Sequence, residues 1–143
     1  MTATWDFDPV HHILRSTFVG KVNDDDLMNH QRMAALLVES LDPLAAIVDL
    51  SGANPFEATP GGMRHLAKLP APMPKVDRPR VVVAPPDHVL GLVRIFQIVG
   101  EATRPNLHVV RTMPEAWLII GVEAAQARFE AVAPHVLHRL SES

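Results

Sequence analysis

Three short apolar runs, each followed by a helical pattern, constrain this sequence more than any other feature. The runs are LAAIVDL (44–50), RVVVAP (80–85) and NLHVVR (106–111). They are mostly apolar and partly β-branched, which is typical of strands covered on both faces. Strands that alternate with helices pair in parallel through right-handed crossovers. The sequence therefore predicts an α/β domain with helices packed on a single sheet.

Capping residues place the starts of the helices. Asn23 is followed by three aspartates, which suit the positive end of a helix dipole. Thr59 precedes a proline, and Asp87 and Thr112 each stand just before an apolar helical pattern. Thr112 also has Glu115 three residues later, the spacing of a capping box. We expect helices over 23–42, 59–69, 86–102, 112–120 and 123–140, the last bent at Pro134.

The amino-terminal segment predicts two further strands. HHILRSTFVGKV (11–22) alternates well enough for a strand, and TWDFD (4–8) can form the other arm of an antiparallel pair. With the three buried strands, this gives a single mixed, mainly parallel sheet of about five strands flanked by helices, in one domain over residues 1–143. The proline-rich PAPMPKVDRP (70–79) is expected to be an extended surface loop.

Composition excludes several classes of protein. The absence of cysteine rules out disulfides, thiolate metal sites and cysteine nucleophiles. The net charge of −3 gives no global field that favours nucleic acid, and the basic stretch 64–80 is interpreted as a solvated loop. No apolar run approaches the ~20 residues of a membrane span, and the first residues lack a leader pattern. We expect a cytoplasmic protein with no nucleic-acid partner and no integral membrane segment.

No motif for catalysis or metal binding is found. The eight histidines include His11 and His12, expected on opposite faces of a strand, and His135 and His138, which share a helix face without a nearby carboxylate. Ser51 is followed by Gly52, but the preceding residues do not form the nucleophile elbow of hydrolases, and TPGGM lacks the lysine of a phosphate loop. We therefore predict no metal, no cofactor and no catalytic residues, although catalytic groups can also converge from distant positions.

One edge of the sheet is the expected place for a site. Ligands of open α/β sheets favour the carboxyl ends of the parallel strands, where the following helices begin. Each side chain gathered there also has a simpler interpretation as a cap or turn residue, which we prefer for the three predicted caps. The residues of this predicted edge are Ser51, Asn54, Thr59, Asp87, His88, Arg111 and Thr112.

The helical stretch HVLGLVRIFQIVG (88–100) is apolar on nearly every side. Such a helix is usually buried, or it meets a partner on its second face. It could also form one wall of an apolar ligand pocket. Core packing and a contact between two copies are compatible, so we expect a homodimer.

Five segments in order resemble a known family. GKVNDDDL, AIVDLSGA, FEATPGGMRHLAKLP, GLVRIFQ and VVRTMPEAWLIIG together look like the SpoIIAA-like family of STAS-type domains, which is also similar to the lipid-binding lobe of CRAL-TRIO proteins. The resemblance spans almost the whole chain. It implies a mixed, mainly parallel sheet and a non-catalytic regulatory or protein-interaction module.

The resemblance also suggests a regulatory residue and an alternative function. STAS proteins of this kind carry an Asp-Ser-Ser-Gly signature whose serine is phosphorylated by a partner kinase. The equivalent stretch here is Glu57-Ala58-Thr59-Pro60, which departs from that signature and has Thr59 as its only hydroxyl. Thr59 and Ser51 are thus the candidate phosphorylation or partner sites. The kinship with CRAL-TRIO proteins implies, as the alternative, a carrier of a small apolar or lipid-like ligand.

Overall fold

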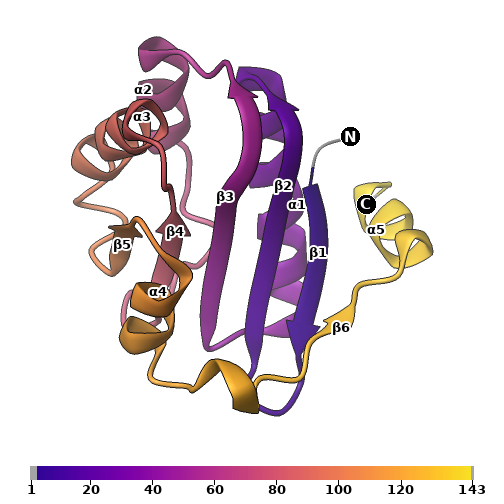
Figure 1. Cartoon of the computed structure of the whole chain (residues 1–143). Coiled ribbons are helices and arrows are strands. Elements are labelled where there is room, and N and C mark those ends of the chain that lie inside the picture. Colours follow the sequence, from indigo (N-terminus) through magenta and orange to yellow (C-terminus); the bar gives the residue numbers. More distant parts are fainter. Residues whose placement is uncertain (1–2, 143) are drawn as a thin grey trace.

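One mixed sheet organises the chain, as this computed structural model of residues 3–142 shows (Figure 1). Six strands lie in the order β5-β4-β3-β2-β1-β6, parallel from β2 to β5 and antiparallel at β1 and β6. The predicted fold class is confirmed, with one short strand more than the five expected. The strands are β1 (Ala3–Asp8), β2 (Ile13–Val22), β3 (Ala45–Phe56), β4 (Arg80–Val83), β5 (Leu107–Val110) and β6 (Glu130–Ala131).

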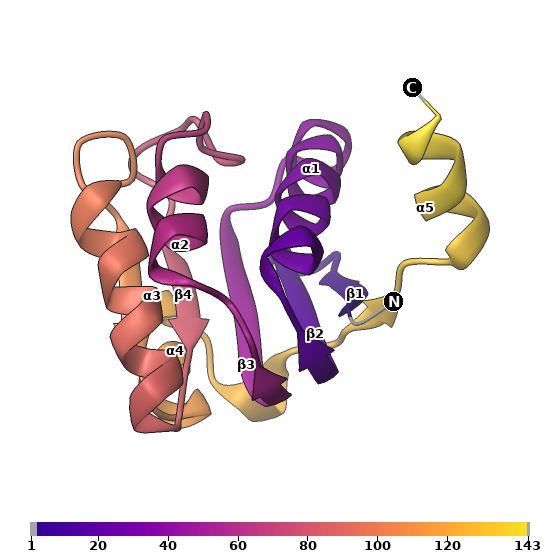
Figure 2. The ribbon, with the colours of Figure 1, turned by 90° about the horizontal axis from the view of Figure 1, so that it is seen from above.

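Three crossover helices cover one face of the sheet, and α4 lies on the other face (Figure 2). Each parallel strand is joined to its neighbour by one helix, so the βα unit repeats three times from β2 to β5. This regular order follows from the alternation of buried strands and capped helices in the sequence. The helices are α1 (Asp24–Leu41), α2 (Pro60–Ala67), α3 (Asp87–Val99), α4 (Met113–Ile120) and α5 (Pro134–Ser141).

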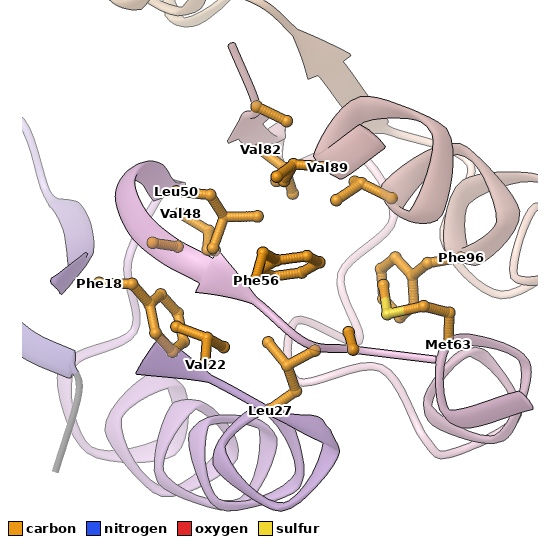
Figure 3. Packing of buried hydrophobic residues seen from close by; sticks show 14 of the residues in the cluster. Phe18, Val22, Leu27, Val48, Leu50, Phe56, Met63, Val82, Val89 and Phe96 are labelled. Atoms are coloured by element: carbon orange, nitrogen blue, oxygen red, sulfur yellow. The ribbon is translucent and has the colours of Figure 1, made fainter. Parts of the chain in front are cut away.

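The main core lies between the sheet and α1, α2 and α3. Figure 3 shows Phe18 beside Val22 on β2, and Met63 of α2 beside Phe96 of α3. Phe18 has no exposed surface at all. Burial of a large apolar side chain contributes roughly 1.5–3 kcal/mol, so this layer supplies much of the stability. A smaller apolar cluster on the opposite face packs α4 against β3, β4 and β5.

The carboxyl-terminal segment does not form the long helix that we predicted over 123–140. A 3₁₀ turn (Ala124–Gln126) is followed by β6, and only then by α5, which starts at Pro134. Val132 N–H donates to the Trp5 carbonyl, so the segment pairs with the edge strand β1 instead of continuing as a helix. Proline is accepted at the first position of a helix but not inside one, which explains why α5 begins there.

The β1–β2 turn also differs from expectation. His11 and His12 lie in this turn, and His12 has a left-handed φ of 57°, so the prediction that they point to opposite faces of a strand is wrong. The buried carboxylate of Asp8 stabilises this turn, because it accepts hydrogen bonds from the N–H groups of Val10 and His11. Burial alone would raise the pKa of Asp8, but hydrogen bonds from the His11 ring and from three backbone N–H groups, one of them in Arg128, lower it to about 2.

Within residues 3–142, no helix is long and apolar enough to cross a membrane.

Candidate functional site

Thr59 caps α2, as predicted, and it also joins two helices. Its Oγ1 accepts a hydrogen bond from the Gly62 N–H at 2.9 Å. The same hydroxyl donates to Asp24 Oδ2 at 2.6 Å, and the Thr59 N–H donates to Asp24 Oδ1 at 2.9 Å. Asp24 is the first residue of α1, so these bonds tie the start of α1 to the start of α2. A phosphate on Thr59 would face the Asp24 carboxylate, and like charges at that distance repel.

Thr112 caps α4, as predicted. Its Oγ1 accepts from the Glu115 N–H at 3.3 Å and donates to Glu115 Oε1 at 2.9 Å. The prediction that Asp87 caps α3 is wrong, because Pro86 occupies the capping position and makes no side-chain cap bond. Asp87 instead forms an ion pair of 2.6 Å with Nη1 of Arg111.

The remaining residues of the predicted edge are exposed. Ser51 and Asn54 belong to β3, which continues beyond the predicted run 44–50 to Phe56, because it pairs with β2 as far as Val22. His88 is exposed in the first turn of α3. All seven residues of the predicted edge lie in the described part of the chain, and the only hydrogen bond or ion pair that joins two of their side chains is the one between Asp87 and Arg111.

A groove of about 410 Å³ lies at the opposite edge of the sheet, near the amino ends of β3 and β4. It is open to solvent and lies between the second half of α1 and the proline-rich segment 71–78, and we name it the proline-loop groove. The predicted surface loop therefore has an inner side, where Pro72 and Met73 are buried. The groove is lined by Ala35, Val38, Glu39, Asp42, Pro43, residues 71–75 and Arg78.

Charged side chains hold the rim of this groove together. Asp42 Oδ1 accepts from Arg78 Nη1 at 2.6 Å and from Lys75 Nζ at 3.2 Å. Hydrogen bonds from Arg78 and then Lys75 lower the pKa of Asp42, so it stays ionised at neutral pH. Arg78 Nη1 also donates to the Pro43 carbonyl at 2.9 Å. These contacts fix the loop against the end of α1.

A smaller space of about 20 Å³ adjoins this groove and shares Ala71, Met73, Lys75 and Arg78 with its lining, and we name it the basic hollow. Four cationic residues line it, and no acidic residue does. Its other lining residues come from the loop and from the segment that leads into β5. The four cations are Lys75, Arg78, Arg80 and Arg104.

Arg104 stabilises the carboxyl end of α2. Its Nη1 donates to the Ala67 carbonyl at 2.7 Å, and its Nη2 donates to the Leu69 carbonyl at 3.0 Å. A cation at this end of a helix satisfies free carbonyls and suits the helix dipole. Its guanidinium also lies 4.9 Å from the centroid of the Phe96 ring. Burial lowers the pKa of Arg104.

His30 is a buried polar group next to these arginines. Its Nε2 is 2.8 Å from Ser16 Oγ, and its ring stacks on Trp5 with the two centroids 4.6 Å apart. Burial, followed by the positive charge of Arg80, lowers the pKa of His30 from 6.5 to about 3. His30 is therefore neutral at physiological pH. His30 and Arg80 both line a further small space of about 40 Å³ beneath α1.

Sequence reasoning missed His30, Arg80 and Arg104. The sequence did contain a sign that Arg80 is partly buried, because it is the first residue of a strand whose next three residues are valines. His30 and Arg104 carried no such signal, because long-range packing buries them. In the described part of the chain, no group of three or more histidine, cysteine, aspartate or glutamate side chains gathers in a way that could hold a metal ion.

Comparison of the chain with protein-family models, with curated proteins and with solved structures found no match in any of the three. The resemblance to the SpoIIAA-like family therefore stays a prediction from the sequence, and the geometry above has to carry the functional argument.

Proposed function

We propose that this chain is a non-catalytic binding domain of the SpoIIAA-like type, which carries a small amphipathic molecule in the proline-loop groove. Of the two functions that the sequence suggested, the groove favours the carrier. The observation that supports this proposal most is the groove itself, whose 410 Å³ lies within the range of small-molecule sites.

The lining of the groove suits a ligand with an apolar body and a charged end. Val38, Pro72 and Met73 supply apolar surface on the two long sides. Lys75 and Arg78 stand at the rim and offer cationic donors next to the basic hollow. An apolar wall with a few convergent polar groups is the usual composition of such sites. A medium-chain fatty acid has the size and chemistry to serve as a probe.

A groove-filling substitution tests this proposal. Ala35 is exposed on α1 and lines the groove, so Ala35→Trp places a large ring in the groove without disturbing the core. Asn29→Trp is the matched control, since Asn29 is exposed on the same helix and does not line the groove. We expect decanoate and decanol binding, measured by calorimetry, to weaken at least tenfold in Ala35→Trp and to be unchanged in Asn29→Trp.

Native mass spectrometry of the protein from its host complements this test. A co-purifying acyl compound that Ala35→Trp lacks would support the carrier. If wild-type protein is always empty and binds neither decanoate nor decanol, the carrier function is wrong.

A second candidate, a protein-interaction module that forms a homodimer, is favoured by one observation. Ile98 is 69% exposed and Val99 is 38% exposed at the carboxyl end of α3. Only Val89, Val93 and Phe96 of this helix are fully buried. We propose that the exposed apolar end of α3 meets the same surface of a second copy. This contact is compatible with a ligand in the groove, because neither Ile98 nor Val99 lines the groove.

A further inference from the structure

Two buried hydrogen-bond donors have no partner in the part of the chain that the structure describes, and both belong to arginines. They are Nη1 of Arg80 and Nε of Arg104. Unpaired buried donors are rare in folded proteins, and each costs the free energy of its lost hydration. Both residues line the basic hollow, and Arg80 also lines the space of about 40 Å³ beside His30.

No carboxylate compensates these two charges. Asp42 pairs with Lys75 and Arg78, but no ion pair joins Arg80 or Arg104 to any described acid. Within residues 3–142, the Arg80 guanidinium makes no hydrogen bond. Its Nη1 is buried, while other parts of the residue are partly exposed to solvent. Burial and the neighbouring charge of Arg104 lower the pKa of Arg80 to about 10, so it stays protonated at neutral pH.

A protonated, desolvated arginine beside another cation is unfavourable unless an anion accompanies it. Residues 3–142 supply no such anion, so a ligand is the candidate source. The hollow has room for one small group, because its 20 Å³ slightly exceeds the space that one water molecule needs. A planar carboxylate matches the fork of a guanidinium and is smaller than a phosphate.

We propose that Arg80 and Arg104 hold a carboxylate group in the basic hollow. Arg80 supplies the main charge, and Arg104 keeps its other donors on the carbonyls of α2. Lys75 and Arg78 form the entrance, because both line the hollow and the proline-loop groove.

The carboxylate can have two sources. It can be the head group of the amphipathic molecule in the groove, and this version rests on the proposed function. It can equally be a small free carboxylic acid that reaches the hollow from solvent. The chemistry that Arg80 recognises is the same in both cases, so the experiment has to separate the sources.

Arg80→Met tests the proposal, with Arg64→Met as the matched control on an exposed face of α2. Binding of decanoate, decanol, acetate and phosphate is measured by calorimetry at constant ionic strength. We expect wild type to bind decanoate roughly tenfold or more tightly than decanol, because only the acid pairs with Arg80. Arg80→Met should bind the two equally, and Arg64→Met should behave like wild type.

A second readout does not depend on a variant. The Nε–H signals of Arg80 and Arg104 in wild-type protein should shift in nuclear magnetic resonance spectra as acetate or decanoate is added. Acetate that saturates these shifts, with decanoate no tighter, supports the carboxylate site and identifies a free acid as the ligand. That outcome would count against the carrier function alone.

Two results would overturn the inference. Decanol that binds as tightly as decanoate, with no shift at either arginine, would leave the carrier function intact and remove the carboxylate site. Phosphate or chloride that shifts both arginine signals as strongly as acetate would show a general response to anions and no site of this kind.

Discussion

His30 shows how a single buried residue sets the response of this fold to acid. Its pKa is 6.5 in an unfolded chain and about 3 in the folded protein, because burial and Arg80 disfavour its charged form. Between these values the unfolded chain binds a proton that the folded chain does not bind. The free energy of unfolding should therefore be unaffected by His30 above pH 6.5 and should fall below it, by up to about 1.4 kcal/mol per pH unit.

Urea unfolding from pH 7 to pH 4 measures this effect. The double variant His30→Phe, Ser16→Ala keeps an aromatic ring against Trp5, leaves no hydroxyl unpaired, and should lose less stability in acid than wild type. His65→Phe is the control, because His65 is exposed. Parallel pH profiles for wild type and the double variant would show that His30 does not carry the acid sensitivity.

Single residues were predictable from the sequence where the cause is local. Asn23, Thr59 and Thr112 cap helices as expected, because a cap depends only on a short side chain and the next three residues. The prediction that Asp87 caps a helix was wrong, because the adjacent Pro86 holds the capping position and the Asp87 carboxylate forms an ion pair with Arg111, which is distant in sequence. The sequence did not reveal that Thr59 also binds Asp24, since that contact joins two helices.

The contact between α1 and α2 depends on one of two adjacent glycines. A Cβ on Gly62 would collide with the carboxylate of Asp24, whereas a Cβ on Gly61 would meet nothing within 4 Å. Gly62→Ala should therefore displace Asp24 from Thr59 and destabilise the protein by about 1–2 kcal/mol. Gly61→Ala should be neutral or stabilise by up to about 1 kcal/mol, because it restricts the unfolded chain.

Denaturant unfolding of the two alanine variants measures this difference. In an Asp24→Ala background the extra cost of Gly62→Ala should disappear, since the group that it displaces is gone. Equal effects of the two glycine substitutions in the wild-type background would contradict the assigned contact.

The exposed end of α3 gives a second test at the level of elements. Ile98→Lys should convert a homodimer to a monomer, because it places a charge in an apolar contact. Leu118→Lys should leave the mass unchanged, since Leu118 is 82% exposed on α4, on the other face of the sheet. Size-exclusion chromatography with light scattering reads both variants. Wild-type protein that stays monomeric at high concentration would exclude the dimer.

Elements were predictable where the pattern was strong. The three apolar runs became β3, β4 and β5, because short buried strands carry a continuous signal. The prediction of one long helix in the carboxyl-terminal segment was wrong. Its apolar residues have a helical spacing, but part of the segment pairs with the edge of β1 instead. Pairing of that kind joins residues more than a hundred positions apart and leaves no local pattern in the sequence.

At the scale of the whole molecule, the two edges of the sheet have different characters. The carboxyl edge, where we predicted a site, holds helix caps and the exposed ion pairs Asp87–Arg111 and Lys21–Glu57. The amino edge holds the proline-loop groove and the basic hollow. The sequence could not predict this second edge, because the groove forms only when the proline-rich loop folds back against the end of α1. The basic stretch 64–80, interpreted as a solvated loop, contributes the partly buried Arg80, whose Nη1 is buried.

The central claim is that a ligand binds at the amino edge, in the proline-loop groove. Nuclear Overhauser effects between decanoate and the side-chain methyl groups of wild-type protein test it most directly. We predict contacts from the acyl chain to Val38 and Met73, and none to the methyl groups of Thr59 and Thr112. Contacts to Thr59 and Thr112 without any to Val38 and Met73 would place the ligand at the carboxyl edge and contradict the account.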